Sequence, residues 1–137
     1  MIRFGPGIAD ALRGRARGLH ERCGLLFGQR TGSVVSVSRL EEVTNVRRSR
    51  SRFAFPPEVL LAHAGDPAWV GVWHSHPGGP AALSAHDRAG AAAWPHLLQV
   101  LLVPPHELLV FDSAERGLSP LSWTQESSPC VIESAGP

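Results

Sequence analysis

The sequence contains no lysine, because all 13 of its Lys or Arg positions are arginine. A chain without lysine cannot itself carry a modifier protein that is attached through a lysine side chain. The arginines are nearly balanced by 12 acidic residues, so the formal net charge at pH 7 is only +1. Such a balance creates no overall field that would draw the protein to nucleic acid or to an anionic membrane. We therefore expect neither of them as a partner.

Long apolar runs are also absent. No stretch approaches the roughly 18 apolar residues that a transmembrane helix needs. The N-terminal segment, MIRFGPGIADALRGRARG, has neither the apolar stretch nor the cleavage site of a signal peptide. Cysteine is scarce: Cys23 lies in an apolar run and Cys130 in a segment rich in Ser and Pro. The two could form a disulfide, but this placement favours reduced thiols, and we expect a cytoplasmic protein.

A chain of 137 residues is long enough for one domain with a hydrophobic core and too short for two. Periodicity and breaker residues predict helices over about 6–18, 56–65 and 84–94. Strands are predicted over 23–30 and 33–40, joined by a turn at Gly32, and then over 47–55, 68–76, 96–104, 106–114 and 120–125. The nearly continuous apolar run at 96–104 is typical of a strand buried on both faces. We expect an α/β domain over 1–125, a mixed sheet with helices on both sides, followed by a poorly ordered tail at 126–137.

A metal site is suggested where the predicted strand 68–76 ends. Side chains two positions apart on a strand point the same way, so His74 and His76 share a face and could bind one ion at about 2.0–2.1 Å. Asp87, in the first turn of the next helix, could supply a third ligand that is anionic. Three protein ligands leave one position open, which is typical of catalytic zinc rather than structural zinc. The neighbouring His86 points about 100° away from Asp87 on a helix, so we expect it not to bind the metal.

Each of these residues also has an ordinary structural interpretation. Ser84 and Asp87 match the S-x-x-D/E box that caps a helix N-terminus, and for that pair alone the cap is the commoner explanation. Two histidines near a strand end are often only polar surface residues. Glu21 is the candidate general base for a metal-bound water, but it could equally be a solvated charge at the end of the first helix. Cys23 is better explained as a small core residue than as a nucleophile.

Other catalytic patterns are missing from the sequence. The segments HERCG and HELLV begin with His-Glu but lack the second histidine of the H-E-x-x-H zinc helix. The zinc deaminase pattern fails because His76 stands where H-x-E needs glutamate, and no C-x-x-C follows. Residues 47–52, RRSRSR, could neutralise phosphates, although so short a run is more often a solvated loop or a contact for an acidic protein.

The pattern of these residues resembles that of the JAMM metalloproteases, the active (MPN+) branch of the MPN-domain family, which includes deubiquitinating enzymes. The family pattern is an upstream glutamate, then H-x-H, seven residues, S, two residues and D. In this chain these are Glu21, His74-Ser75-His76, residues 77–83, Ser84 and Asp87. The extension HSHP, the strand C-G-L-L-x-G after the glutamate and, more loosely, RFAFPPE also fit. The resemblance covers the chain from the first predicted helix to about residue 125.

The resemblance implies a single MPN (JAMM) domain with cytidine-deaminase-like layering. It implies that His74, His76 and Asp87 bind one Zn²⁺ per chain and that Glu21 is the general base that deprotonates the zinc-bound water. Ser84 then donates its hydroxyl to the tetrahedral oxyanion, a role that is compatible with a cap. The implied reaction is hydrolysis of an amide bond by a zinc metalloprotease.

The resemblance also suggests substrates, which are ubiquitin-like proteins that end in Gly-Gly. Small stand-alone bacterial members are often associated with sulfur-carrier proteins of the ubiquitin-like fold. This chain lacks the long insertions with which chain-specific deubiquitinases hold a second ubiquitin, so we favour a sulfur-carrier substrate over ubiquitin conjugates. A further alternative is a non-catalytic MPN scaffold, which the complete ligand set disfavours. The oligomeric state is left open, with a homodimer as one option.

Overall fold

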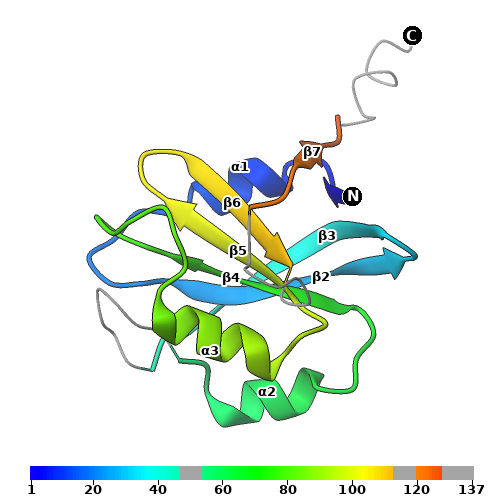
Figure 1. Cartoon of the computed structure of the whole chain (residues 1–137), viewed down its shortest axis with the longest axis horizontal. Helices are drawn as coiled ribbons and strands as arrows, with labels where there is room; N and C mark the ends of the chain where they lie inside the picture. The colour runs from blue at the N-terminus through cyan, green and yellow to red at the C-terminus, as the bar shows by residue number, and fades with distance from the viewer. Residues whose placement is uncertain (47–53, 113–119, 128–137) are drawn as a thin grey trace, which may run out of the picture.

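The computed structural model describes residues 1–46, 54–112 and 120–127. Their strands form one mixed sheet with the order β6-β5-β4-β2-β3-β1-β7 (Figure 1). The strands are β1 (Ile2–Phe4), β2 (Cys23–Thr31), β3 (Val34–Val43), β4 (Trp69–Ser75), β5 (Leu98–Val103), β6 (Glu107–Asp112) and β7 (Trp123–Gln125). The helices are α1 (Ile8–Arg13), α2 (Pro57–His63) and α3 (Ala85–Ala93). None of the described helices has the length and apolarity to cross a membrane.

The centre of the sheet is formed by β2, which pairs antiparallel with both β3 and β4. Strand β5 runs parallel to β4 and antiparallel to β6, whereas β1 runs parallel to both β3 and β7. The two ends of the sheet approach each other, because the Leu121 N–H donates to the Val110 carbonyl at 2.7 Å and Trp123 Nε1 donates to the Leu108 carbonyl at 3.1 Å. The sheet therefore curls, and α1 packs between β3 and β6.

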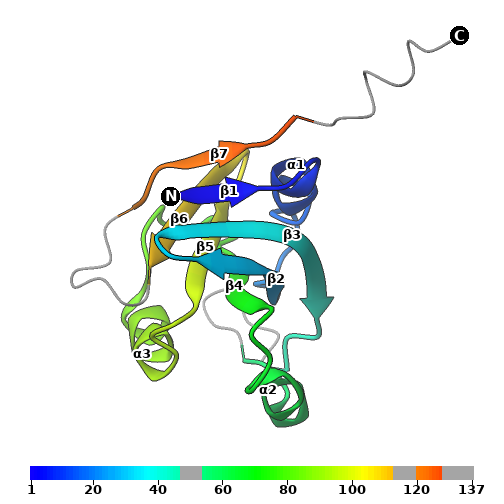
Figure 2. The same ribbon diagram turned by 90° about the vertical axis from the view of Figure 1, so that its right-hand side faces the viewer.

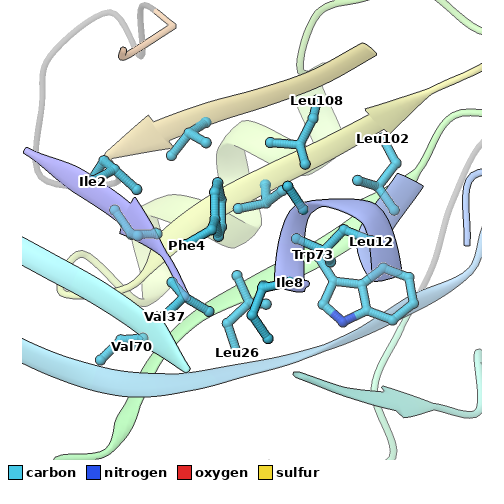
Figure 3. Packing of buried hydrophobic residues seen from close by; sticks show 14 of the residues in the cluster. Ile2, Phe4, Ile8, Leu12, Leu26, Val37, Val70, Trp73, Leu102 and Leu108 are labelled. Carbon is cyan, nitrogen blue, oxygen red and sulfur yellow. The ribbon is translucent and has the colours of Figure 1, made fainter. Parts of the chain in front are cut away.

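Helices cover both sides of the sheet, as the sequence predicts: α1 lies on one side, and α2 and α3 lie on the other (Figures 1 and 2). The larger apolar cluster fills the α1 side (Figure 3), with Phe4, Leu12, Val35, Trp73, Val100 and Val110 among its members. A smaller cluster under α2 and α3 contains Leu25, Phe27, Trp69, Val72 and Leu97. Every residue of β5 is buried, which confirms the prediction of a strand covered on both faces.

A β-bulge decides which residues of β4 face each side. Opposite β2, Gly71 pairs with Leu26 and Trp69 with Phe27, so Val70 is an extra residue between them. After the bulge the normal alternation resumes, with Trp73 in the cluster on the α1 side and Val72 in the cluster under α2 and α3. His74 follows Val72 by two positions and therefore faces α3.

Two elements near the N-terminus differ from the prediction. Strand β1 was not predicted, because three residues are too few to show a period and their pairing depends on distant strands. The first helix ends at Arg13 rather than near residue 18. Gly14 is its C-cap, and the N–H groups of Arg15 and Ala16 that follow bond to carbonyls three residues back instead of four. Gly18, with φ of 128°, lies in irregular chain beyond the helix.

The predicted strand 47–55 is wrong where the structure describes it. Residues 47–53, which include the RRSRSR run, lie outside the described residues, and Ala54 and Phe55 belong to no strand. The Ala54 backbone is instead bonded to Val46 and to the side chain of Asn45, and Pro56 and Pro57 follow. The domain limits of 1–125 and 126–137 stay a prediction, since residues 128–137, with Cys130, also lie outside the described part.

Candidate metal centre

Four side chains that the sequence singles out meet in one buried cluster. Glu21 precedes β2, His74 and His76 lie at the end of β4, and Asp87 lies in the first turn of α3. One ligand atom from each lies within 4.8 Å of the others. The exposed fractions are 1% for Glu21, 0% for His74 and 5% for both His76 and Asp87. Three separate segments of the chain thus build one site.

The antiparallel pairing of β2 with β4 brings the glutamate to the histidines. Cys23 is the partner of His74, and the Ser75 N–H donates to the Arg22 carbonyl at 2.9 Å. Glu21 lies two positions before Cys23, so its side chain points to the same face as that of His74. This contradicts the alternative that Glu21 is a solvated charge at a helix end, because it is buried and no helix precedes it directly.

Three nitrogen and oxygen atoms form a nearly equilateral triangle. His74 Nε2 and His76 Nε2 lie 3.2 Å apart, and Asp87 Oδ2 lies 3.2 Å from the first and 3.1 Å from the second. Ligand atoms about 2.0–2.1 Å from a tetrahedral zinc ion stand about 3.3–3.4 Å apart. The spacing of these atoms therefore suits one small metal ion with only slight adjustment.

A backbone contact orients one of the histidines. His76 Nδ1 lies 3.0 Å from the Pro80 carbonyl oxygen, which can only accept a hydrogen bond. The proton of a neutral imidazole is thereby assigned to Nδ1, and the lone pair of Nε2 points to the cluster. Burial of both rings also contradicts the alternative that His74 and His76 are ordinary surface residues.

Asp87 belongs to the cluster and to a helix cap at the same time. The Ser84 N–H donates to Asp87 Oδ2 at 2.9 Å, and the Asp87 N–H donates to Ser84 Oγ at 3.1 Å, which completes the capping box. The capping interpretation is confirmed, and it does not compete with metal binding, since the cap fixes Asp87 where it meets the histidines. The Ser84 oxygen accepts the cap bond with a lone pair, so the cap does not use the hydroxyl hydrogen.

Glu21 carries the clearest electrostatic signature of the site. Neither of its carboxylate oxygens has a hydrogen-bond partner among the described residues. Burial raises the pKa of Glu21 to about 7, with the neighbouring His76 opposing the shift and Asp87 adding to it. A buried carboxylate without donors is costly, and a cation within the cluster would offset that cost. The residues present therefore fit a metal ion.

The other pKa shifts follow from the same contacts. Burial lowers the pKa of His74, which favours the neutral form that binds metals. For His76, burial also lowers the pKa, but the hydrogen bonds to Asp87 and the Pro80 carbonyl raise it on balance. Burial raises the pKa of Asp87, yet its contacts with the two histidines and with the Ser84 N–H outweigh that effect and hold the pKa well below its usual range. Asp87 is therefore an anion in the cluster.

Two neighbouring residues lie outside this cluster in the described part of the chain. His86 is not among the four residues of the cluster. Cys23 is buried at the start of β2, and burial raises the pKa of its thiol to about 12. A thiol with so high a pKa is a poor nucleophile, which confirms that Cys23 is a core residue.

A cavity of about 170 Å³ lies next to the cluster and was not predicted. Asp87 and His86 form part of its wall, and Gly90 of α3 lines it as well. The remaining lining is largely apolar and comes from α2, α3, β4 and β5, from the chain before α2 and from the chain between α3 and β5. Its residues are Ala54, Phe55, Leu60, Trp69, Val72, Ala93, Trp94, Leu97 and Gln99. Because these side chains come from distant parts of the chain, no local pattern could have revealed the cavity.

Comparisons with known proteins agree with this architecture. Residues 9–111 match the family described as prokaryotic homologs of the JAB domain. A solution structure of a Desulfitobacterium hafniense protein is 26% identical, with a TM-score of 0.77 over 93% of this chain and 94% of that chain. A Salinibacter ruber protein is 23% identical, with a TM-score of 0.61 and 93% of each chain covered.

A crystal structure of a JAB1/MPN domain protein from Archaeoglobus fulgidus is similar in fold alone, at 15% identity. Its TM-score is 0.57 over 90% of this chain and 97% of that chain. A comparison with curated proteins finds no significant match.

Proposed function

The chain belongs to the family of prokaryotic homologues of the JAB domain, and on that premise we propose that it is a zinc-dependent metallopeptidase. The proposed reaction hydrolyses the amide or isopeptide bond after the C-terminal Gly-Gly of a ubiquitin-like protein of the sulfur-carrier type. One observation carries the proposal: a buried glutamate without hydrogen-bond partners in the described residues stands beside a His-His-Asp triangle. A site that served only folding would gain no free energy from burying a carboxylate without hydrogen-bond partners in the described residues.

In this proposal His74, His76 and Asp87 hold the zinc ion. When bound, zinc supplies Lewis acidity, which polarises a carbonyl group and makes water more acidic. Glu21 accepts a proton from the attacking water at a carboxylate oxygen and passes it to the leaving amine. Neither carboxylate oxygen of Glu21 has a hydrogen-bond partner among the described residues, so both are available for this proton transfer. Ser84 donates its hydroxyl hydrogen to the oxyanion that forms on the substrate.

The family resemblance suggests the proposed substrate, and chemistry and size are compatible with it. Two glycines have no side chains, so their backbone can approach a buried centre closely. The largely apolar cavity beside Asp87 offers a place for an apolar side chain near the Gly-Gly segment. A single carrier protein needs one docking surface of about 800 Å², which a domain of this size can supply. Linkage-specific cleavage of polyubiquitin would require a second docking surface.

Metal binding can be tested by elemental analysis of the purified protein. We expect about one zinc per chain in the wild type and almost none in the double variant His74→Ala, His76→Ala. His86→Ala and His106→Ala are controls that remove histidines outside the cluster, and they should keep the zinc. Equal zinc in the wild type and the double variant would contradict the assignment of the ligands.

Substrate choice can be tested by mass spectrometry. A sulfur carrier with residues appended after Gly-Gly and a panel of diubiquitins are incubated with the zinc-loaded enzyme. We expect the carrier to be cut after Gly-Gly and the diubiquitins to be cut slowly or not at all. Rapid cleavage of diubiquitin with an intact carrier would favour a deubiquitinase-like isopeptidase. Failure to cut either substrate would favour the non-catalytic scaffold.

A further inference from the structure

One peptide unit beside the candidate metal centre has both of its polar groups bound by buried side chains. This peptide joins Glu21 to Arg22. Asn45 Nδ2 donates to the Glu21 carbonyl oxygen at 2.8 Å, and the Arg22 N–H donates to Ser75 Oγ at 2.8 Å. Asn45 is 9% exposed and Ser75 is 0% exposed. The C=O and N–H of a trans peptide point in opposite directions, so the two side chains hold this peptide from two sides. Asn45 binds its C=O and Ser75 binds its N–H, and we call this arrangement the clamp.

The clamp lies where the regular ladder of the sheet stops. The paired part of β2 begins at Cys23, which faces Val43 of β3 and His74 of β4. Toward β3 the Glu21 carbonyl has a side-chain donor, and toward β4 the Arg22 N–H has a side-chain acceptor. For these two groups side chains replace strand-to-strand bonds, whereas the next carbonyl, that of Arg22, still accepts a backbone bond from the Ser75 N–H at 2.9 Å.

The Glu21 carboxylate depends on this support more than most side chains would. Neither of its oxygens has a hydrogen-bond partner in the described residues, so no bond of its own keeps it in the cluster. An ionised carboxylate without donors gains free energy by turning toward water. Its position in the cluster is therefore set by the backbone that carries it.

Asn45 is itself held in place. Its Oδ1 accepts the Ala54 N–H at 3.1 Å, and the Val46 N–H donates to the Ala54 carbonyl at 3.2 Å. The amide consequently has a fixed orientation, with the Nδ2 group directed at the Glu21 carbonyl. A side chain oriented in this way can position another residue accurately.

We propose that Asn45 and Ser75 are positioning residues that keep the Glu21 carboxylate in the metal centre by clamping the Glu21–Arg22 peptide. The proposal rests on the proposed function for its kinetic consequence, but the clamp can be measured without a substrate. It also explains the serine between the two histidines. His74 and His76 face the metal site, whereas Ser75 faces the opposite side of the strand. There its hydroxyl oxygen accepts the N–H of the peptide that joins Glu21, the proposed general base, to Arg22.

Substitutions at the two clamp residues are compared with matched controls elsewhere in the sheet. Ser75→Ala removes the acceptor, and Ser75→Thr keeps the hydroxyl. Ser38→Ala removes another hydroxyl that bonds a β2 carbonyl, that of Phe27, away from the centre.

Asn45→Ala is matched by Gln125→Ala. The Gln125 amide also bridges two backbone segments, from the Ala9 N–H to the Gly5 carbonyl, without contacting the cluster. All variants are assayed where each is fully folded and carries one zinc per chain.

The first readout is hydrogen exchange of the Arg22 amide, followed by NMR. We expect exchange at least about tenfold faster in Ser75→Ala than in the wild type, and nearly unchanged in Ser75→Thr and Ser38→Ala. Unchanged exchange in Ser75→Ala would overturn the clamp whether or not the protein is an enzyme. Faster exchange in Ser75→Ala, combined with a wild type that cuts no substrate, would support the clamp and reject only the proposed function.

The second readout is kinetic. Ser75→Ala and Asn45→Ala should each lower kcat about 10- to 100-fold with little change in KM, because misplacement of a catalytic group by about 1 Å can cost that much. In a Glu21→Gln background the same changes should have almost no further effect, since there is no base left to position. Losses of kcat no larger than those of Ser38→Ala and Gln125→Ala, or equal losses in both backgrounds, would overturn the positioning role.

Discussion

The two faces of β4 bury opposite kinds of side chain. Toward α1, Val70 and Trp73 join an apolar cluster in which the polar group of Trp73 is satisfied by the Glu41 carbonyl at 3.1 Å. Toward α3, Val72 packs into a second apolar cluster, but His74 then enters a buried polar group with Glu21. The same strand thus serves a hydrophobic core on one face and a candidate catalytic centre on the other.

This difference indicates how stability and function are divided within the domain. On the α1 face, β4 contributes apolar contacts that favour folding, and its one polar side chain there, Ser75, holds the Glu21–Arg22 peptide. The α3 face buries two carboxylates, of which Glu21 has no hydrogen-bond partner in the described residues, an arrangement that costs free energy unless a cation is present. Changes to the apolar side chains on the α1 face should therefore affect stability, whereas changes to the four-residue polar cluster on the α3 face should affect metal binding and rate.

The largest expected effect comes from Glu21→Gln on the α3 face. The variant should keep one zinc per chain yet lose about 10²- to 10⁴-fold in the rate of carrier cleavage, because glutamine cannot accept the proton. Steady-state kinetics and elemental analysis on the same sample check this. Glu58→Gln, at an exposed position in α2, is the control and should leave both values unchanged. Near-normal activity of Glu21→Gln would mean that another group is the base.

Phe4→Ala should produce the converse result on the α1 face. Phe4 is fully buried and its ring packs against Trp123 with centroids 5.3 Å apart. Deletion of the ring should lower the free energy of unfolding by about 3–5 kcal/mol, as for other large-to-small changes in cores. Urea unfolding of the metal-free protein measures this loss. The folded fraction should still bind zinc, and a loss of zinc from folded protein would break the proposed separation of the two faces.

The pH dependence of stability sharpens the comparison for the metal-free protein. The pKa of Glu21 is raised from an ordinary 4.5 to about 7 in the folded state, so the unfolded chain releases this proton first as pH rises. The Glu21 contribution to stability is thus fully present below about pH 4.5 and is lost as pH rises through 7.

Glu21→Gln removes this titration. In the presence of a chelator, its unfolding free energy relative to wild type should increase by about 2 kcal/mol between pH 5 and pH 8. Urea unfolding at several pH values measures the trend, and Glu58→Gln should show none. A difference between Glu21→Gln and wild type that does not change with pH would contradict the raised pKa.

The smallest expected effect concerns the cavity. A Cβ built on Gly90 meets no atom within 4 Å, so Gly90→Leu can extend into the space beside Asp87 without backbone strain. We expect about a tenfold lower kcat/KM for the carrier, mainly through KM, with zinc content and folding unchanged. Gly90→Ala is the matched control that leaves most of the space. Unchanged kinetics of Gly90→Leu would indicate that substrate does not use the cavity.

Several features of this protein were determined by the sequence alone. The segment from His74 to Asp87 predicts its own geometry, because strand alternation places two histidines on one face and the S-x-x-D box begins a helix beside them. Both rules act over a few residues, and the structure agrees with both. The apolar run of β5 and the hairpin signal at Gly32 between β2 and β3 likewise predicted strands that the structure contains.

Only the tertiary structure decided the rest, because it depends on residues far apart in the chain. By spacing alone, Glu21 was a weak candidate, and the pairing of β2 with β4 brought it to the histidines. The same pairing places Ser75 on the Glu21–Arg22 peptide, and the pairing of β2 with β3 brings Asn45 to it. Four elements contribute to the cavity beside Asp87. Strand β1 was not predicted because it also depends on residues far away in the chain. Its three residues form a strand through hydrogen bonds to β3 on one side and β7 on the other.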